Sequence, residues 1–240
     1  MKINKSVALI TGSTRGIGKA IALELAKNNY TVVVTGTNQQ LIDEVVSQIK
    51  ADGGEAFGIA SNLLDKNAPE LLINKVIDQF GKLDVLVNNA GLAWADSFEN
   101  VTEKDYDKIM GLNVKVPMFL TKAALPYLLQ SSEKAIVNIS SVVGHKAYAR
   151  QTLYAASKHA LNGMMSALAK EYRAQKLRVY NVAPGGVATE MIQTARPDLD
   201  PNTLIQPEEI AKTVLFLFSL KGNAQIDEVR IRRQDNTPFE

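Results

Sequence analysis

The chain of 240 residues contains no cysteine and only two histidines, His145 and His159. Without thiols it can form no disulfide bond, no thiolate metal site and no cysteine nucleophile. Two imidazoles also leave too few ligands for the usual protein zinc site. We therefore expect a function that uses no bound metal.

An excess of charge of one sign is also missing, since 27 Lys and Arg against 25 Asp and Glu give a net charge of +2. Nucleic acids and acidic lipid surfaces are bound mainly through a strong positive field. We therefore expect neither a nucleic-acid nor a membrane partner. Arg230, Arg232 and Arg233 form a local basic cluster, which leaves nucleic-acid binding as an alternative that a gel-shift at physiological salt would test.

Long hydrophobic runs are absent near the N-terminus, where the apolar run from Val7 to Ile10 is too short for a signal sequence or a membrane span. This favours a cytoplasmic location. No linker rich in Pro, Gly or Ser divides the chain, and 46% hydrophobic residues can fill one large core. The sequence predicts a single domain over residues 1–240.

Short β-branched runs alternate with longer stretches of helical period, which is the pattern of repeated βαβ units. Runs such as VVV at 32–34 are wholly apolar, as strands buried on both faces should be. We expect an α/β fold: a Rossmann-type, doubly wound parallel sheet of about seven strands in three layers. The expected strands are Ser6–Thr11, Thr31–Thr35, Glu55–Ala60, Leu83–Val87, Lys134–Ile139, Leu177–Val182 and Asp227–Arg232.

The first expected strand leads directly into Gly12, Gly16 and Gly18 and then into an amphipathic helix. Glycines at such a turn allow positive φ and close backbone approach, and the helix N-terminus presents free N–H groups to an anion. The loop therefore predicts a site for the pyrophosphate of a dinucleotide. Its spacing, Gly-x3-Gly-x-Gly, differs from the commoner Gly-x-Gly-x2-Gly, and a purely structural glycine turn is the alternative.

Cofactor selectivity is expected at the end of the second strand, where an acidic residue would bind the ribose 2′-hydroxyl. Gly36, Thr37 and Asn38 stand there, with no carboxylate, and Arg15 in the glycine loop can pair with a 2′-phosphate. We therefore expect NADP(H) to be favoured over NAD(H). A merely solvated Arg15 is the alternative.

Tyr154 and Lys158 are four residues apart in a helical pattern, so their side chains share one face. A nearby ammonium lowers the pKa of a phenol and suits it to general acid–base work. An ordinary surface pair has the same spacing. Ser140 and Ser141 end the fifth expected strand, where a hydroxyl could hold a substrate oxygen beside Tyr154, although serine is also common in turns.

Pro117 interrupts the expected helix over Ile109–Leu120. Because proline has no N–H, the carbonyl of Asn113 loses its intrahelical donor and must find another partner, such as a water near Lys158. A simple kink is the alternative. Downstream, residues 186–206 form an excursion that is too long for a routine connection, and we expect a substrate loop there.

The glycine loop, Asn88-Asn89-Ala90-Gly91, Asn113, Ser141 and Tyr154-x3-Lys158 occur in this order along the chain. Together they resemble the short-chain dehydrogenase/reductase family over almost the whole chain, and the pattern is similar to 3-oxoacyl-(acyl carrier protein) reductases. The C-terminal segment, AQIDEVRIRRQDNTPFE, differs from the glycine-rich ending that those reductases usually have.

The resemblance implies a catalytic tetrad of Asn113, Ser141, Tyr154 and Lys158. The implied reaction is hydride transfer between NADP(H) and a small-molecule carbonyl or alcohol, and the implied assembly is a homodimer or homotetramer. A regulatory or scaffold protein that binds NADP(H) with little catalysis is the alternative. The cofactor-binding residues implied or expected are Gly12, Ser13, Arg15, Ile17, Gly18, Thr37, Asn62, Leu63, Asn89, Ala90, Gly91, Tyr154, Lys158, Pro184, Gly185, Val187 and Thr189.

Overall fold

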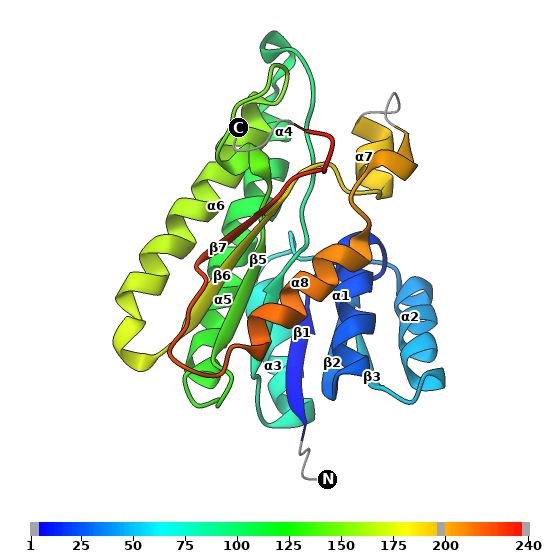
Figure 1. The fold of residues 1–240 in the computed structure, drawn as a ribbon, viewed down its shortest axis with the longest axis vertical. Coiled ribbons are helices and arrows are strands. Elements are labelled where there is room, and N and C mark those ends of the chain that lie inside the picture. Colours follow the sequence, from blue (N-terminus) through cyan, green and yellow to red (C-terminus); the bar gives the residue numbers. More distant parts are fainter. Residues whose placement is uncertain (1–4, 196–199, 237–240) are drawn as a thin grey trace.

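Seven parallel strands form the centre of the molecule (Figure 1), seen here in a computed structural model that describes residues 5–195 and 200–236. Their order across the sheet is β3-β2-β1-β4-β5-β6-β7. The strands are β1 (Ser6–Ile10), β2 (Tyr30–Gly36), β3 (Glu55–Ala60), β4 (Val85–Asn88), β5 (Ala135–Ile139), β6 (Arg178–Pro184) and β7 (Glu228–Ile231). The predicted doubly wound α/β fold is confirmed.

The strand ends differ from those predicted by at most two residues, and β4 shows why. The expected strand begins at Leu83, but the observed one begins at Val85. The backbone N–H of Val7 is bound instead by the side chain of Asp84, whose Oδ2 accepts at 2.7 Å. A side chain thus replaces a backbone partner at the start of the ladder.

Helices cover both faces of the sheet. On the face turned to the viewer in Figure 1 lie α1 (Gly16–Lys27), α2 (Gln39–Ala51) and α8 (Pro207–Ser219). The opposite core contains residues of α3 (Ala68–Phe80), α5 (Val116–Leu128) and α6 (Thr152–Glu171). Successive residues of β1 alternate between these two cores, which is why its run of apolar residues is uninterrupted.

The strand order reverses between β1 and β4, because β2 and β3 extend the sheet to one side and β5, β6 and β7 to the other. In open α/β sheets, ligands bind at the carboxyl ends of the strands at such a switch point. The glycine loop follows β1 and the Asn88-Asn89-Ala90-Gly91 sequence ends β4 and continues beyond it, so both lie at this point.

The excursion over 186–206 leaves the sheet after β6 and returns to its own base. Val187 and Ile205 form a parallel bridge, and Ala188 N–H donates to the Ile205 carbonyl at 2.8 Å. Between them lie the short helix α7 (Glu190–Ala195) and a 3-10 turn at Pro201–Thr203. Of its two prolines, Pro201 thus begins regular structure, while Pro197 lies outside the described residues.

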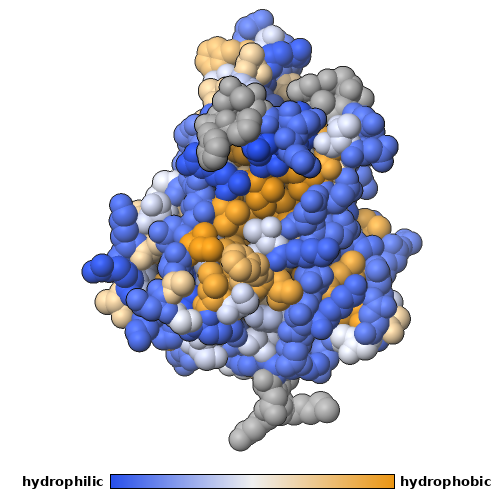
Figure 2. Space-filling view, viewed as in Figure 1, coloured by the Kyte–Doolittle hydropathy of each residue, from blue (hydrophilic) through white to orange (hydrophobic). Residues whose placement is uncertain are grey.

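In the described ranges, no helix combines the length and the apolar character needed to cross a bilayer. Figure 2 shows apolar surface gathered over α8 and the neighbouring strands, within a mostly hydrophilic face. Phe216 of α8 is 53% exposed.

Candidate active site

The glycine loop has the conformation that its glycines predict. Gly12 and Gly16 have φ of +62° and +54°, in the region that residues with a Cβ rarely adopt. A Cβ on Gly18 would lie 2.4 Å from the carbonyl oxygen of Gly12, so this position is closed to any larger residue. The loop therefore needs glycine for conformation at two positions and for packing at a third.

The N-terminus of α1 opens onto this loop. Arg15 is the N-cap residue, and its carbonyl accepts the N–H of Lys19 at 3.2 Å. The N–H groups of Gly16, Ile17 and Gly18 precede that first helical bond and have no partner within the helix. Such groups together with the positive end of the helix dipole fit a pyrophosphate.

Three polar side chains, those of Thr11, Ser13 and Asn89, hold the loop in place. Thr11 Oγ1 accepts the N–H groups of Asn89 and Ala90, both at 3.0 Å, and Asn89 Nδ2 donates to the carbonyls of Thr11 and Gly12. Ser13 Oγ donates to the Ile10 carbonyl at 2.8 Å. The side chains of Asn89 and Ser13 thus shape the loop. The Ser13 side chain is 0% exposed, so it supports the loop from below and does not itself contact a ligand.

The ends of β2 and β3 lie beside the glycine loop. A Cβ on Gly36 would meet Thr14 at 2.7 Å, and Ser61 N–H donates to the Gly36 carbonyl at 2.8 Å. Asn62, which follows, donates from Nδ2 to Asp65 at 2.7 Å. Thr37 and Asn62 therefore lie near the loop at the expected adenosine side.

Leu63 is buried with the core on the α3 and α5 face, at 7% exposure. Its side chain therefore packs inward. For Leu63, only the backbone remains suited to a contact with a cofactor.

Arg15 is paired in this structure. Its Nη1 lies 2.5 Å from Oε2 of Glu190, the first residue of α7, and both side chains are about two-thirds exposed, at 69% and 66%. The guanidinium is therefore ion-paired as well as largely exposed to water, and its role toward a 2′-phosphate stays a prediction. This partner is 175 positions away, and no local pattern in the sequence pointed to it.

Tyr154 and Lys158 lie in the first half of α6, where Lys158 is buried and Tyr154 is partly buried. Lys158 Nζ is 5.7 Å from the centroid of the Tyr154 ring and donates to the carbonyl of Ile139, at the end of β5, at 3.0 Å. Ser141 follows that strand, and its side chain lies close enough to Tyr154 to lower the pKa of the phenol. The three residues predicted to act together are therefore neighbours at the carboxyl edge of the sheet.

Burial sets the acid–base properties of this pair. It raises the pKa of the Tyr154 phenol above its usual range, and the nearby Ser141 side chain opposes this with a smaller effect. Burial lowers the pKa of Lys158 to about 8. The expectation that Lys158 lowers the pKa of Tyr154 is therefore wrong for the chain alone, because removal from water outweighs the other influences on the phenol.

Asn113 lies in a π-helical turn, Gly111–Lys115, between α4 (Glu103–Met110) and α5. Val116 N–H donates to the carbonyl of Gly111, five residues back, so the expected interruption before Pro117 is a π-bulge. The Asn113 side chain is 1% exposed and holds both backbone groups of Leu92: Oδ1 accepts N–H at 2.8 Å, and Nδ2 donates to the carbonyl at 2.9 Å.

Ser157 links Asn113 to the tyrosine helix and was not anticipated from the sequence. Asn113 Nδ2 donates to Ser157 Oγ at 3.0 Å, and that hydroxyl donates to the Tyr154 carbonyl at 2.8 Å. Its position three residues after Tyr154, on the same helix face, was the available signal. Gly91 lies against the same group, since a Cβ there would be 3.2 Å from Asn113 Oδ1 and 3.7 Å from Lys158 Nζ.

The segment from Pro184 to Thr189 runs from the end of β6 to the glycine loop, which it reaches at Thr189. Gly185 N–H donates to the Ile231 carbonyl of β7 at 2.7 Å, and Val187 is 5% exposed. A Cβ on Gly16 would lie 3.1 Å from Cγ2 of Thr189. The structure thus brings Thr189 to the glycine loop, while Val187 is packed in the core.

Asn88 of the Asn88-Asn89-Ala90-Gly91 motif forms a ladder beneath this edge with two asparagines that the sequence analysis missed. Asn88, Asn138 and Asn181 occupy one register of β4, β5 and β6. Asn88 Nδ2 donates to Asn138 Oδ1 at 2.9 Å, and Asn138 Nδ2 donates to Asn181 Oδ1 at 3.1 Å. The register that aligns them is not visible in the sequence.

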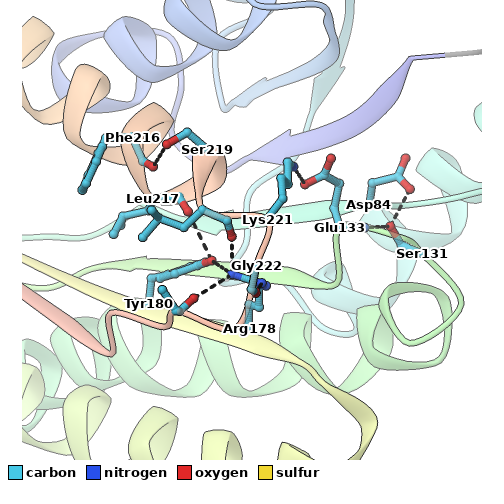
Figure 3. A network of polar contacts seen from close by, with 12 residues as sticks. Asp84, Ser131, Glu133, Arg178, Tyr180, Phe216, Leu217, Ser219, Lys221 and Gly222 are labelled. Atoms are coloured by element: carbon cyan, nitrogen blue, oxygen red, sulfur yellow. Dashed lines mark hydrogen bonds and ion pairs between the residues drawn. The ribbon is translucent and has the colours of Figure 1, made fainter.

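A polar network at the opposite, amino edge of the sheet belongs to the scaffold (Figure 3). The guanidinium of Arg178 donates to the carbonyls of Leu220 and Gly222, both at 2.6 Å, and so satisfies backbone groups after α8. A cavity of about 50 Å³ beside it is lined by Ser132, Glu133, Ala135, Arg178, Tyr180, Phe218, Leu220 and Lys221. This cavity is too small for a dinucleotide and lies away from Tyr154.

A family model and the sequences of known proteins assign the chain to the same family. Residues 6–200 match the family model for short chain dehydrogenases. The 3-oxoacyl-(acyl-carrier-protein) reductase FabG of Staphylococcus aureus is 36% identical over 231 residues, covering 92% of this chain and 94% of the relative. The 3-oxoacyl-(acyl-carrier-protein) reductase of Synechocystis is 37% identical over 230 residues, covering 93% of each chain.

Solved structures agree. A metagenomic short-chain oxidoreductase in complex with NADP superposes with a TM-score of 0.84 at 33% identity, covering 97% of this chain and 98% of that one. A short chain dehydrogenase from Shigella flexneri complexed with NADP gives 0.89 at 31% identity, with the same coverage. By fold, motifs and similarity over nearly its full length, the chain belongs to the short-chain dehydrogenase/reductase family of NAD(P)-dependent oxidoreductases.

Proposed function

We propose that this protein is an NADP(H)-dependent carbonyl reductase whose catalytic residues are Asn113, Ser141, Tyr154 and Lys158. The observation that carries the proposal is the meeting of Tyr154 with Ser141 and Lys158 at the carboxyl edge of the sheet, beside the glycine loop. The bound cofactor would supply the hydride that the reduction needs. The chain supplies the proton, the alignment of the carbonyl and the exclusion of water.

Tyr154 is the proposed proton donor. Its raised pKa keeps it protonated at neutral pH, so a proton is available for the oxygen of the reduced carbonyl. Ser141 lies beside the phenol, and a carbonyl oxygen placed between them would accept from both hydroxyls. Such preorganised donors stabilise charge as it develops on that oxygen.

Lys158 is proposed to stabilise the phenolate that remains after the proton has left. Its Nζ spends one N–H on the Ile139 carbonyl, which leaves two donors for the tyrosine and a ribose. Asn113 is proposed to hold a relay water at its backbone carbonyl, which Pro117 leaves without an N–H donor four residues later. Its side chain meanwhile fixes Leu92 and Ser157 around the site.

The preference for NADP(H) rests on two features of this chain. No carboxylate follows β2, and Arg15 stands at the N-cap of α1, next to the glycine loop. The NADP bound to two of the similar solved structures supports the same choice. Residues 186–206 are proposed as the substrate loop, since Thr189 reaches the glycine loop from that segment.

A 3-oxoacyl thioester is the proposed substrate class, supported by the names of the most similar reductases described above. The test is a panel of 3-oxoacyl thioesters, dicarbonyls, sugars and steroids, with NADPH oxidation followed by absorbance. Turnover of the thioesters above the other classes supports the proposal. Turnover confined to sugars or steroids contradicts the substrate class, and no turnover of any carbonyl contradicts the reductase function.

A homodimer or homotetramer is proposed on the resemblance to the family. Exposed aromatic and sulfur side chains on the helices that flank Asn113 support it: Tyr106 is 52% exposed, Met118 46% and Phe119 43%. Light scattering on the purified chain measures the assembly directly. The cytoplasmic location expected from the sequence stays a prediction.

A further inference from the structure

The ion pair between Arg15 and Glu190 joins two parts of the proposed cofactor site that are remote in sequence. Arg15 caps α1 at the glycine loop, and Glu190 begins α7 in the excursion over 186–206. Their side chains meet at 2.5 Å, and the neighbouring Thr189 lies against Gly16. The first turn of α7 is therefore held on the loop that would bind the pyrophosphate.

This pair can be exchanged for a stronger one. Both side chains are about two-thirds exposed, and exposed ion pairs favour the paired state by only about two- to five-fold. A phosphate monoester carries more charge than a carboxylate and offers three acceptor oxygens to the guanidinium fork. If a 2′-phosphate comes within reach of Arg15, it is the preferred partner.

Binding of the Glu190 carboxylate and of a 2′-phosphate to Arg15 at the same time is unfavourable. Glu190 occupies Nη1, and a phosphate on the remaining donors would face the carboxylate across one guanidinium. Two negative charges on opposite sides of one guanidinium repel each other, and the repulsion grows as water is displaced. Glu190 and a 2′-phosphate are therefore competitors.

We propose that Glu190 is a specificity-determining residue that competes with the 2′-phosphate of NADP(H) for Arg15. The proposal rests on the cofactor assignment made above. It gives Glu190 a defined effect: the residue weakens binding of the 2′-phosphorylated cofactor and leaves NAD(H) unaffected, so it lowers selectivity. It also means that the 2′-phosphate releases the first turn of α7 from Arg15.

The test uses two nucleotides that differ only in the phosphate, adenosine 2′,5′-bisphosphate and AMP. Neither contains nicotinamide, so contacts of Thr189 with that end of the cofactor do not enter the result. Calorimetric titration of both into the parent and Glu190→Gln measures binding without any turnover. We expect Glu190→Gln to bind the bisphosphate about two- to five-fold more tightly and AMP with unchanged affinity.

Two further proteins make the result specific. In an Arg15→Ala background, Glu190→Gln should change neither affinity, because the group for which the anions compete is gone. Asp78→Asn removes the same charge from an exposed position near the end of α3, at the amino edge of the sheet, and should leave both affinities as in the parent.

Weaker or unchanged binding of the bisphosphate by Glu190→Gln would overturn the proposal, because Glu190 would then orient Arg15 or be irrelevant to it. An equal gain for AMP, or the same gain in Asp78→Asn, would also overturn it by showing a general charge effect. A parent that binds the bisphosphate no better than AMP would remove the cofactor assignment as well. A parent that discriminates normally while Glu190→Gln has no effect would remove only the competition.

Discussion

The ammonium of Lys158 lies 5.7 Å from the centroid of the Tyr154 ring while Nζ donates to the Ile139 carbonyl at 3.0 Å. The lysine is thus fixed between the tyrosine helix and the end of β5. Lys158 is buried and Tyr154 is partly buried, so few other groups stabilise a charge on either side chain, and the proton balance of the site depends on this pair.

We predict that carbonyl reduction declines as the pH rises through about 8. Burial lowers the pKa of Lys158 to about 8, so its ammonium is present below that pH and lost above it. Tyr154 does not limit the rate in this range, because burial raises its pKa and keeps it protonated. The measurement is kcat against pH from 6 to 10 with a saturating substrate.

Lys158→Arg is the matched variant for this profile. Arginine keeps its charge throughout the range, so the alkaline decline should move upward or vanish even if the rate itself is lower. A decline at the same pH in both proteins would assign it to another group.

Gly18→Ala should weaken NADPH binding by roughly ten-fold or more and reduce the free energy of unfolding by about 1–3 kcal/mol. The added Cβ would lie 2.4 Å from the Gly12 carbonyl oxygen and from Asn89 Nδ2, so the loop must move. Fluorescence titration and urea unfolding measure the two effects.

Gly163→Ala provides the control, because a Cβ there meets nothing within 4 Å inside α6. It should raise the free energy of unfolding by about 0.5–1 kcal/mol with unchanged binding. If Gly18→Ala behaved in the same way, close packing of the glycine loop would have no role in cofactor binding.

Pro117→Ala should lower turnover while leaving the melting temperature unchanged or higher. The new N–H can donate to the Asn113 carbonyl and convert the π-bulge at Gly111–Lys115 toward regular helix. Any water held at that carbonyl would be displaced. Steady-state kinetics and calorimetry test this, and an unaltered kcat would contradict the relay proposed for Asn113.

Arg15→Ala should weaken NADPH binding by roughly ten- to a hundred-fold and leave NADH binding nearly unchanged. A charge-assisted hydrogen bond to a phosphate contributes about 1.5–3 kcal/mol, and NADH has no 2′-phosphate. Titration of both cofactors into the parent and the variant measures the difference. Equal weakening of both would make Arg15 a pyrophosphate contact instead.

The fold was predictable because strands that are buried in the sheet consist mostly of apolar residues. Strands such as β1 and β2 are buried on both faces, so their sequences are nearly continuous apolar runs. The glycine loop was predictable for a related reason, since a sharp turn at positive φ demands glycine locally. The start of β4 was predicted less accurately, because the Asp84 side chain takes the place of a backbone group there.

The parts of the site that depend on tertiary packing were not predictable. The spacing of Tyr154 and Lys158 identified the pair but not its burial, and burial reverses the expected direction of the tyrosine pKa. The contacts of Arg15 with Glu190 and of Asn113 with Leu92 join segments far apart in sequence, and no local pattern encodes them.

The most direct test of the central claim is the turnover of Tyr154→Phe with the best substrate from the carbonyl panel. The change removes only the phenolic hydroxyl, so NADPH binding should stay within a few-fold of the parent. General acid catalysis contributes about 10²–10⁴ to the rate, and we predict a loss of kcat of that size. A purified variant that binds NADPH normally and reduces the substrate at more than about a tenth of the parent rate would contradict the assignment of Tyr154 as the proton donor.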